Sequence, residues 1–316
     1  MIEKDKKTVK YLYTYACHED EVSLCRLEMR SLFGFDNKTL ILESPLKINP
    51  SRSPFIKERI DSLYCCGSLK ELVNLISDFK IVESTFKVVF IENPTNRGEF
   101  PFDQKRKIAR EIGSQIQGTV DLICPKVVFA LMPIKDGWVF GEYHKSESIW
   151  LQHQLKPNNY STALSTRVAR AVVNIAVPHP FGMKVIDPCC GIGTVLVEAL
   201  SMGIDIIGSD RNPLVTGGAR ENIAHFGLAG EVKLADMRNI ENHYDIAIID
   251  MPYNLCSVLP ADVQLEMLRC ARLFADKAVI VTVEEIDSFI HEAGFSIKDR
   301  GIAKKGRFKR QVLVCE

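Results

Sequence analysis

The sequence predicts an α/β protein with a mostly parallel sheet that carries an antiparallel hairpin at its edge, preceded by an α+β region. Two observations predict this. From about residue 184 onward, short β-branched runs alternate with amphipathic helical stretches. This alternation is typical of parallel strands joined by right-handed crossovers and covered by helices on both faces. Before about residue 150, short strand-like runs are interleaved with few helices and the alternation is absent.

In the C-terminal half, each β-branched run ends in an acid or a turn. The expected strands are KVIDP, IDIIGSD, EVKLAD, YDIAIID and KAVIVTV, at residues 184–188, 204–210, 231–236, 244–250 and 277–283. The expected helices lie at residues 194–203, 214–227, 263–274 and 284–295. The last two runs, 295–305 and 307–316, are joined by a basic turn with no helix between them, which predicts an antiparallel hairpin on the sheet edge.

The N-terminal half gives weaker patterns. The expected strands are at 11–17, 39–45 and 86–93, with a hairpin of 126–134 and 136–144 turned at Asp136-Gly137. The expected helices are 22–34, stopped by Gly34, then 69–79, and 102–118, ending at Gly118. These elements suggest one or two small α+β units. A segment that begins polar and becomes an amphipathic helix places the boundary between the halves near residue 155.

Composition bounds the class of protein. A chain of 316 residues is comfortable for two domains of roughly 150 residues each. No apolar run reaches the ~18 residues of a bilayer span, and MIEKDKKTVK lacks the apolar core of a secretion signal, so we expect a cytoplasmic protein. The 40 basic residues balance 40 acidic ones, which argues against unspecific coating of nucleic acid by bulk charge.

The ten cysteines are scattered among core-like segments and include the adjacent pairs Cys65-Cys66 and Cys189-Cys190. In a protein without a secretion signal, reduced thiols are the better interpretation. The sequence contains no C-x-x-C and no histidines at zinc-ligand spacing, so we expect no structural zinc and no other metal.

Four expected strands of the C-terminal half end in aspartate, at Asp187, Asp210, Asp236 and Asp250. The carboxyl ends of parallel strands meet at one edge of a sheet, where open α/β sheets bind their ligands. One such residue is ordinary as a turn or a helix cap. Four on successive strands predict a ligand crevice lined by carboxylates.

The loop after Asp187 narrows the kind of ligand. Gly191 and Gly193 open a helix at Thr194, so the backbone can approach a ligand closely and the helix N-terminus favours an anionic group. A dinucleotide fingerprint needs a third glycine where Leu196 stands, and the lysine of a phosphate-binding loop is absent. Asp210 is placed to accept from both hydroxyls of a ribose, and Asp236 from an exocyclic adenine amine. These features describe adenosine without phosphates, bearing an amino-acid tail.

The stretch DPCCGIGT resembles motif I of the class I S-adenosylmethionine-dependent methyltransferases, and GSDRNP and LADMRN resemble their two acidic motifs. The tetrad Asp250-Met251-Pro252-Tyr253 is similar to the (D/N)PPY motif IV of methyltransferases that act on exocyclic or amide nitrogens. IAREIGSQIQGTVDLICPKVVFALM and DGWVFGEYH resemble a THUMP RNA-binding module, and NNYSTALSTRVARAVVNIA resembles the segment that leads into the catalytic domain. The chain therefore resembles the tRNA guanine-N2 methyltransferases, in the tRNA guanosine-10 branch of archaea and eukaryotes.

This resemblance implies three regions: a ferredoxin-like region at 1–60, a THUMP-like RNA-binding domain at 61–150 and a Rossmann-like class I methyltransferase domain at 151–316. It implies S-adenosylmethionine as cofactor and tRNA as substrate. The residues expected to hold the cofactor are Asp187, Pro188, Cys189, Gly191, Gly193, Thr194, Asp210, Arg211, Asp236, Met237 and Asp250. Cys189 and Cys190 are then small turn residues beside the cofactor, because nitrogen methylation needs no covalent cysteine.

The expected catalytic residues are Asp250, Met251, Pro252 and Tyr253. A guanine N2 amine is a poor nucleophile because its lone pair is drawn into the ring. The Asp250 carboxylate and the Met251 carbonyl would face its hydrogens and turn the lone pair toward the methyl group, so that catalysis is mainly orientation. Tyr253 would stack on a base swung out of its helix. Met251 replaces the first proline of the family motif but keeps the carbonyl.

Basic residues are the candidates for RNA contact through phosphate, which positions RNA without reading its sequence. They are Lys105, Arg106, Lys304, Lys305, Arg307, Lys309 and Arg310. Arg167 and Arg170 are weaker candidates for the same role.

Other functions stay open at this point. A second enzyme reading keeps the cofactor and changes the acceptor to an adenine N6 of nucleic acid or to a glutamine amide. A different class of protein is a weakly active, tRNA-binding adaptor that retains the cofactor pocket. The guanosine that is modified, the number of methyl groups added and the need for a small activator subunit or a homo-oligomer stay open as well.

Overall fold

The computed structural model describes residues 10–252, 259–305 and 308–316. It divides into two compact units that interleave along the sequence. Unit 1 consists of the chain up to Ala16, Asn37–Ser51 and Phe55–Glu147. Unit 2 consists of Cys17–Asp36, Arg52–Pro54 and Ser148–Glu316. The expected boundary near residue 155 lies close to Ser148, where unit 2 takes over the rest of the chain.

Unit 1 is built on one seven-stranded sheet in the part of the chain that is described. Its strands, in spatial order, are β2 (Ile41–Ser44), β1 (Tyr11–Tyr15), β3 (Ile56–Cys66), β7 (Gly137–Lys145), β6 (Val127–Ile134), β4 (Lys80–Phe90) and β5 (Gln117–Val120). β4 runs parallel to its neighbours β5 and β6, and the other pairs are antiparallel. The hairpin of β6 and β7, expected at Asp136-Gly137, is confirmed.

Helices α2 (Leu69–Ile76) and α3 (Phe102–Gln115) cover the sheet of unit 1. Leu72 and Ile112 pack there with an aromatic cluster in which the Phe129 and Phe140 rings stack at 5.5 Å. Helix α3 ends at Gln115 and not at Gly118 as expected. The reason is that the following residues bond to the open edge of β4 as a parallel strand.

The sequence analysis missed β3, the strand on which β1 and β7 pair. Its alternation is obscured by charged residues, because Arg59 is buried there and donates from Nε to Asp61 Oδ1 at 2.5 Å and from Nη1 to the Ile48 carbonyl at 2.8 Å. A buried charge that is paired and hydrogen-bonded can occupy a strand interior. The hydrophobic pattern alone could not indicate this.

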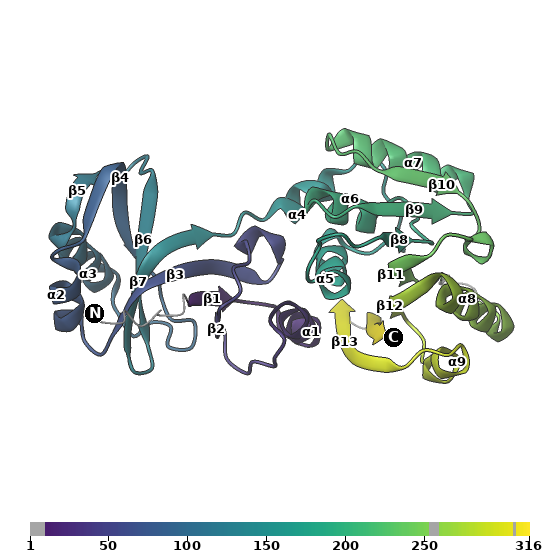
Figure 1. Ribbon diagram of the computed structural model, residues 1–316, viewed down its shortest axis with the longest axis horizontal. Coiled ribbons are helices and arrows are strands. Elements are labelled where there is room, and N and C mark those ends of the chain that lie inside the picture. Colours follow the sequence, from purple (N-terminus) through teal and green to yellow (C-terminus); the bar gives the residue numbers. More distant parts are fainter. Residues whose placement is uncertain (1–9, 253–258, 306–307) are drawn as a thin grey trace, which may run out of the picture. The chain divides into compact units, whose positions relative to one another are not determined.

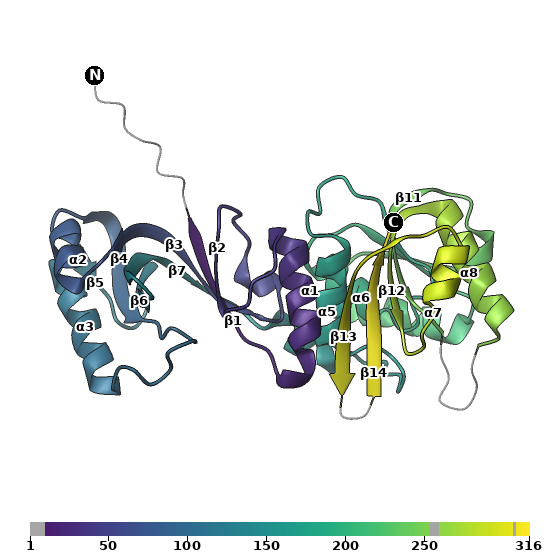
Figure 2. The same ribbon diagram turned by 90° about the horizontal axis from the view of Figure 1, so that it is seen from below.

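Unit 2 also has a seven-stranded sheet among its described residues. Its order is β10 (Glu231–Leu234), β9 (Ile206–Asp210), β8 (Val185–Asp187), β11 (Tyr244–Asp250), β12 (Ala275–Thr282), β14 (Phe308–Cys315) and β13 (Ile297–Lys305). The five strands from β10 to β12 are parallel. β14 runs antiparallel to β12 and forms the edge hairpin with β13. The predicted fold class is confirmed: a mostly parallel sheet with an antiparallel edge hairpin (Figures 1 and 2).

Helices cover both faces of this sheet (Figure 1). One face carries α5 (Thr166–Ala176), α6 (Thr194–Ser201) and α7 (Pro213–His225), and the other carries α8 (Ala261–Phe274) and α9 (Asp287–Glu292). The short helix α4 (Ile149–Gln152) precedes α5. The side chains of Ile186, Ala247, Ile249 and Leu313 pack against α8 and α9. Because side chains alternate along a strand, the residues between them face α5 and α6.

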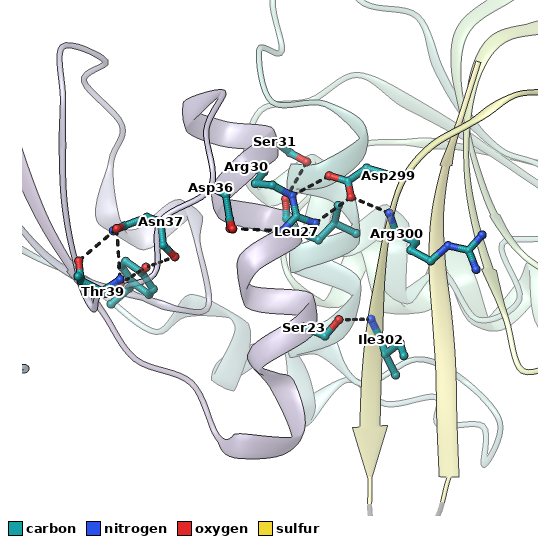
Figure 3. A network of polar contacts seen from close by, with 11 residues as sticks. Ser23, Leu27, Arg30, Ser31, Asp36, Asn37, Thr39, Asp299, Arg300 and Ile302 are labelled. Carbon is teal, nitrogen blue, oxygen red and sulfur yellow. Dashed lines mark hydrogen bonds and ion pairs between the residues drawn. The ribbon is translucent and has the colours of Figure 1, made fainter.

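Helix α1 (Val22–Phe33) comes from the N-terminal part of the chain and belongs to unit 2. Figures 2 and 3 show it against β13. Arg30 donates from Nε and Nη2 to the two carboxylate oxygens of Asp299, each at 2.8 Å, and the Ile302 N–H donates to Ser23 Oγ at 3.0 Å. Helix α1 ends at Gly34, which has φ +82° and donates to the Arg30 carbonyl, as the sequence predicts.

A buried polar network ties α1 and α5 together. Glu28 is fully buried, and it accepts from Asn174 Nδ2 at 2.6 Å and from Ser53 Oγ at 2.5 Å. Arg52 donates from Nε to Asn174 Oδ1 at 2.9 Å. Since each partner satisfies a buried polar group of another, segments Cys17–Asp36 and Arg52–Pro54 are bound to unit 2.

No helix in the described ranges is long and apolar enough to cross a membrane.

Candidate active site

Three of the four predicted aspartates converge on one face at the carboxyl edge of the sheet in unit 2. Asp187, Asp210 and Asp250 end β8, β9 and β11. Ile186 and Ile249, one residue before Asp187 and Asp250, and Ile207, three residues before Asp210, pack on the opposite face with α8. Because side chains alternate along a strand, the three carboxyl groups face α5 and α6. Burial raises the pKa of Asp187, and the charges of the neighbouring Asp250 and Asp210 raise it further.

These carboxyl groups line a crevice of about 510 Å³. Its wall contains predicted cofactor and catalytic residues, namely Asp187, Pro188, Cys189, Gly191, Thr194, Asp210, Arg211, Asp236, Met237, Asp250, Met251 and Pro252. Gly193 is not among the lining residues; it is the N-cap of α6, between Ile192 and Thr194, which do line the crevice. Tyr253 lies outside the described residues. A volume of this size suits a small organic ligand such as a nucleoside.

The glycine loop adopts a backbone conformation that glycine permits, and the helix expected at Thr194 follows it. Gly191 and Gly193 have φ of +51° and +77°, a region that other residues rarely adopt. A Cβ at Gly193 would lie 3.1 Å from the Ala219 Cβ of α7, so this glycine also permits close packing of α6 on α7. Thr194 begins α6, and its buried Oγ1 has no hydrogen-bond partner among the described residues.

Asp210 is held by the backbone. Its Oδ2 accepts from the Gly191 N–H at 3.0 Å and its Oδ1 from the Asn212 N–H at 2.9 Å. Because each carboxylate oxygen has a second lone pair, Asp210 keeps acceptor capacity toward the crevice. The loop and this carboxylate therefore position each other.

Asp236 differs from the expectation that it ends a strand. β10 ends at Leu234, and Asp236 instead caps the single turn Met237–Asn239. Arg238 donates from Nε to Oδ1 at 3.0 Å and from Nη2 to Oδ2 at 2.7 Å. These bonds lower the pKa of Asp236 to about 2. Asp236 is a fixed, ionised acceptor on the crevice wall.

Asp250 is the least satisfied carboxyl group of the crevice. Its buried Oδ1 has no hydrogen-bond partner among the described residues. Burial raises its pKa to about 7, against the opposing effect of the Arg310 charge. A buried polar atom without a partner is costly, and such atoms mark functional sites more often than ordinary cores.

Met251 follows Asp250 with its side chain buried in the core under α8. Its N–H donates to the Val281 carbonyl at 2.9 Å, which extends the pairing of β11 with β12 by one residue. A proline at this position has no N–H and could not make this bond. The hydrogen bond and the buried side chain thus fix the backbone where the family motif uses a ring.

The adjacent cysteines carry neutral thiols. Burial raises the pKa of both Cys189 and Cys190 well above the ordinary value. Cys189 Sγ lies 3.7 Å from Met237 Sδ on the crevice wall. A thiolate is needed for attack or for metal binding, so neither role suits these residues. The described residues contain no cluster of three or more histidine, cysteine or acidic side chains that could hold a metal ion.

The predicted RNA-binding residues are scattered and differ in availability. In unit 1, Lys105 is paired with Glu92, and Arg106 is exposed with its guanidinium over the Phe102 ring. In unit 2, Lys304 and Lys309 are exposed and face each other across the hairpin. Arg307 and the side chain of Lys305 lie outside the described residues.

Two further arginines have structural partners. Arg170 is buried, and its Nη1 donates to Glu198 Oε2 at 2.7 Å, so the prediction that it contacts RNA is wrong. Glu198 also accepts from His153, and its helix α6 is thereby held to α5. Arg167 pairs with Glu21 at 3.0 Å and lies over the Trp150 ring.

Two parts of the crevice wall were not predicted as site residues. One is the segment before α5, with Tyr160, Thr162, Ala163 and Leu164. Its only signal is the resemblance of NNYSTALSTRVARAVVNIA to a segment leading into a catalytic domain. The other is the start of α8, with Leu259, Pro260, Val263 and Met267. In the sequence those residues have the pattern of an ordinary hydrophobic core, and only the packing of α8 directs them toward the crevice.

Comparison with known proteins gives the following matches. Residues 153–258 match the RMKL-like methyltransferase domain, UPF0020. The chain is 33% identical over 103 residues to the "tRNA (guanine(10)-N2)-dimethyltransferase" of Methanothermobacter thermautotrophicus, which covers 32% of this chain and 30% of that protein. It is 27% identical over 141 residues to the Bos taurus "U6 snRNA (guanine-N(2))-methyltransferase THUMPD2", which covers 42% of this chain and 28% of that protein.

Among solved structures, the chain is similar to "TrmN from Thermus thermophilus", with a TM-score of 0.48, 18% identity and coverage of 97% of this chain and 99% of that chain. The chain matches only about a third of the length of its curated relatives. The matched residues include the glycine loop and the four aspartates of the crevice wall. The comparisons thus show that residues 153–258, about a third of the chain, match an RMKL-like methyltransferase domain.

Proposed function

We propose that this protein is an S-adenosylmethionine-dependent RNA methyltransferase that transfers a methyl group to the N2 amine of a guanosine in tRNA. The observation that carries the proposal is the buried Oδ1 of Asp250, which has no hydrogen-bond partner among the described residues and lies in the same crevice as the glycine loop and Asp210. The names of the relatives from Methanothermobacter thermautotrophicus and Bos taurus both specify methylation of a guanine N2 in RNA.

The crevice residues fit S-adenosylmethionine. Asp210 has acceptor capacity for the two ribose hydroxyls, and Asp236 offers ionised oxygens for an adenine amine. The unpartnered Thr194 Oγ1, at the start of α6, suits the carboxylate of the amino-acid tail. Asp210 and Asp250, when ionised, favour a positively charged sulfonium in the crevice that they line. When bound, the cofactor supplies an electrophilic methyl group.

The residues of the protein would orient and deprotonate the acceptor amine. Asp250 Oδ1 is available to accept a hydrogen bond from the guanine N2, and the Met251 carbonyl is a second acceptor on a backbone fixed by β12. Holding the amine in this way is an orientation effect worth several kcal/mol, on the order of 7–11 in favourable cases. A carboxyl group with a pKa of about 7 can also take up the proton that the amine loses.

We infer that a THUMP-like domain at 61–150, which follows a ferredoxin-like region at 1–60 in the sequence, contributes to RNA binding. Helix α3 supports this, because Arg106, Lys107 and Arg110 are exposed on it. A cytoplasmic location is part of the same proposal, and the free cysteines of the described ranges agree with a reducing compartment.

The test is methylation of unmodified tRNA by the purified full-length protein with tritiated S-adenosylmethionine. Nucleoside mass spectrometry of the product should show N2-methylguanosine or its dimethyl form. Asp250→Asn should abolish transfer and leave S-adenosylmethionine affinity within a few fold. The matched control is Asp276→Asn, an exposed aspartate in β12 whose loss should leave transfer unchanged. N6-methyladenosine as the product, or binding of tRNA without transfer, would overturn the proposed function.

A further inference from the structure

We propose that Arg310 is a positioning residue for the reaction assigned above: it shares the face of the sheet with Asp250, anchors the segment before α5 and keeps the Asp250 carboxyl group ionised as an acceptor. The placement of Arg310 comes from the structure, whereas its effect on methyl transfer rests on the proposed function. The basic turn was expected to contact RNA phosphate, so the proposal gives this one arginine a different role.

The register of the sheet places Arg310 beside the crevice. Asp250 pairs with Val281 of β12, and Val281 pairs with Val312 of β14. Residues paired in this way project from the same face, and Arg310 lies two residues before Val312 on that face. The alternation along β14 is consistent with this placement, because Leu313 and Cys315, at the alternate positions, pack on the opposite face with α8. Since β14 is antiparallel to β12, Arg310 lies just beyond the carboxyl edge.

The Arg310 side chain is directed toward the crevice wall. Its Nη2 donates to the Thr162 carbonyl at 2.8 Å, and Thr162 lines the crevice with Ala163 and Leu164. The guanidinium also lies over the Phe308 ring, 4.8 Å from its centre. Arg310 is half-buried. These contacts hold the guanidinium over the face that carries Asp250, in contrast to the exposed Lys304 and Lys309.

The groups that surround Asp250 on this face differ in charge. Asp187 of β8 is buried, and burial raises its pKa well above the ordinary value of an aspartate. Cys189 is neutral for the same reason. From β12, Val281 and Thr282 bring no charge, and neither does the Thr162–Leu164 segment. Arg310 is the charged group that lowers the pKa of Asp250 against the effect of burial.

Ionised Asp250 accepts a hydrogen bond from the guanine amine and can receive its proton, whereas a protonated carboxyl group can do neither at that oxygen. An opposite charge nearby shifts the pKa of a carboxyl group by about one unit or more. Removing the Arg310 charge should therefore raise the pH at which Asp250 ionises by about one unit. At pH 6, below both midpoints, the ionised fraction falls about tenfold for such a shift.

The direct test follows the Asp250 carboxyl group without any substrate. Full-length protein labelled with ¹³C at the aspartate carboxyl carbons is titrated by NMR, and the Asp250 signal is assigned by its loss in Asp250→Asn. In Arg310→Gln the midpoint should rise by about one pH unit. Arg310→Met, which keeps the packing on Phe308, gives the same comparison if the glutamine variant does not fold. Arg310→Lys should restore most of the shift.

Lys309→Gln is the matched control for this titration. Lys309 is next to Arg310 in β14, so this variant removes an equal charge from the opposite face of the sheet. Its Asp250 midpoint should match that of the unmodified protein. An equal midpoint in Arg310→Gln or Arg310→Met and in the unmodified protein would overturn the proposal. So would an equal shift in Lys309→Gln.

The consequence for the reaction is read from the pH dependence of kcat under saturating tRNA. The rising limb should move to higher pH in Arg310→Gln, and Arg310→Lys should return it toward its original place. If Arg310 served only to anchor Thr162, its loss would lower kcat equally at every pH, and the rising limb of the pH profile would not move. Failure of the proposed function would instead show as no transfer by the unmodified protein at any pH, with the NMR shift still present.

Discussion

Replacing Asp250 by asparagine is expected to stabilise the folded protein above pH 7 while it stops methyl transfer. The Asp250 carboxyl group lies at the end of β11 with Oδ1 unpartnered among the described residues. Burial raises its pKa to about 7 from an ordinary value of 3.8. Ionising this group therefore opposes folding, and asparagine has nearly the same shape without the charge. Asp250 therefore lowers the stability of the folded protein, and its proposed role in methyl transfer explains why an aspartate occupies this position.

The magnitude follows from the two pKa values. One pKa unit corresponds to about 1.4 kcal/mol, so a shift from 3.8 to about 7 amounts to about 4 kcal/mol at most. Between these values the folded state holds the proton and the unfolded state does not, so the free energy of unfolding falls as pH rises through this window. At pH 5 roughly 1.6 kcal/mol of the effect is present, so the advantage of Asp250→Asn should grow by about 3 kcal/mol between pH 5 and pH 8.

The assay is urea unfolding of both proteins at pH 5, 6, 7 and 8, with the free energy of unfolding extrapolated to water. Asp187 also has a raised pKa, but both proteins contain it and its effect largely cancels. Asp276→Asn, at an exposed position of β12, is the control and should track the unmodified protein at every pH. A stability difference between Asp250→Asn and the unmodified protein that is the same at pH 5 and pH 8 would refute the reasoning.

Three further predictions test the loop, the motif and the packing of α1. Asp210→Ala should weaken binding of S-adenosylmethionine at least about tenfold in equilibrium dialysis, because charge-assisted hydrogen bonds are lost; Asp205→Ala, at the exposed start of the same strand, should not, and equal binding by both would contradict the role of Asp210. Met251→Pro removes the bond to Val281 and the buried side chain, and should lower the free energy of unfolding by about 2–4 kcal/mol; unchanged urea unfolding would contradict this account of motif IV. Gly301→Ala puts a Cβ 2.9 Å from Leu27 Cδ2 and 3.2 Å from the Ser23 carbonyl, and should lower the thermal midpoint through about 1–3 kcal/mol of overpacking. Gly217→Ala meets open space in α7 and should raise that midpoint or leave it unchanged; a fall of equal size in both variants would show that α1 does not press on β13.

The fold of unit 2 and the outline of its crevice were predictable from the sequence because they depend on local patterns. β-branched runs alternate with helical periodicity, and β8, β9 and β11 each end in an aspartate at the edge where the carboxyl ends of parallel strands meet. The glycine loop was predictable for a similar reason, since Gly191 and Gly193 need positive φ whatever surrounds them. The edge hairpin followed from two strand-like runs without a helix between them.

What the tertiary structure decided depends on contacts between distant segments. Helix α1 has the pattern of an amphipathic helix of the N-terminal half, yet the hydrogen bonds from Arg30 to Asp299 and from Asn174 to Glu28 assign it to unit 2. β3 was hidden because its buried arginine is paired. Arg310 and Arg170 looked like surface charges, and only their partners Thr162 and Glu198 show otherwise.

The physical reason for this division is the range of the interactions. Hydrophobic periodicity, glycine conformations and strand-end acids act within a few residues of the chain, so the sequence displays them. The pairing of a buried charge and the pKa of a carboxyl group depend on atoms that only folding brings within hydrogen-bond or Coulomb distance. The sequence therefore determined which residues reach the crevice edge. The tertiary structure determined that Asp250 Oδ1 is buried there with no hydrogen-bond partner in the part of the chain that is described, and that Arg310 lies on the same face of the sheet.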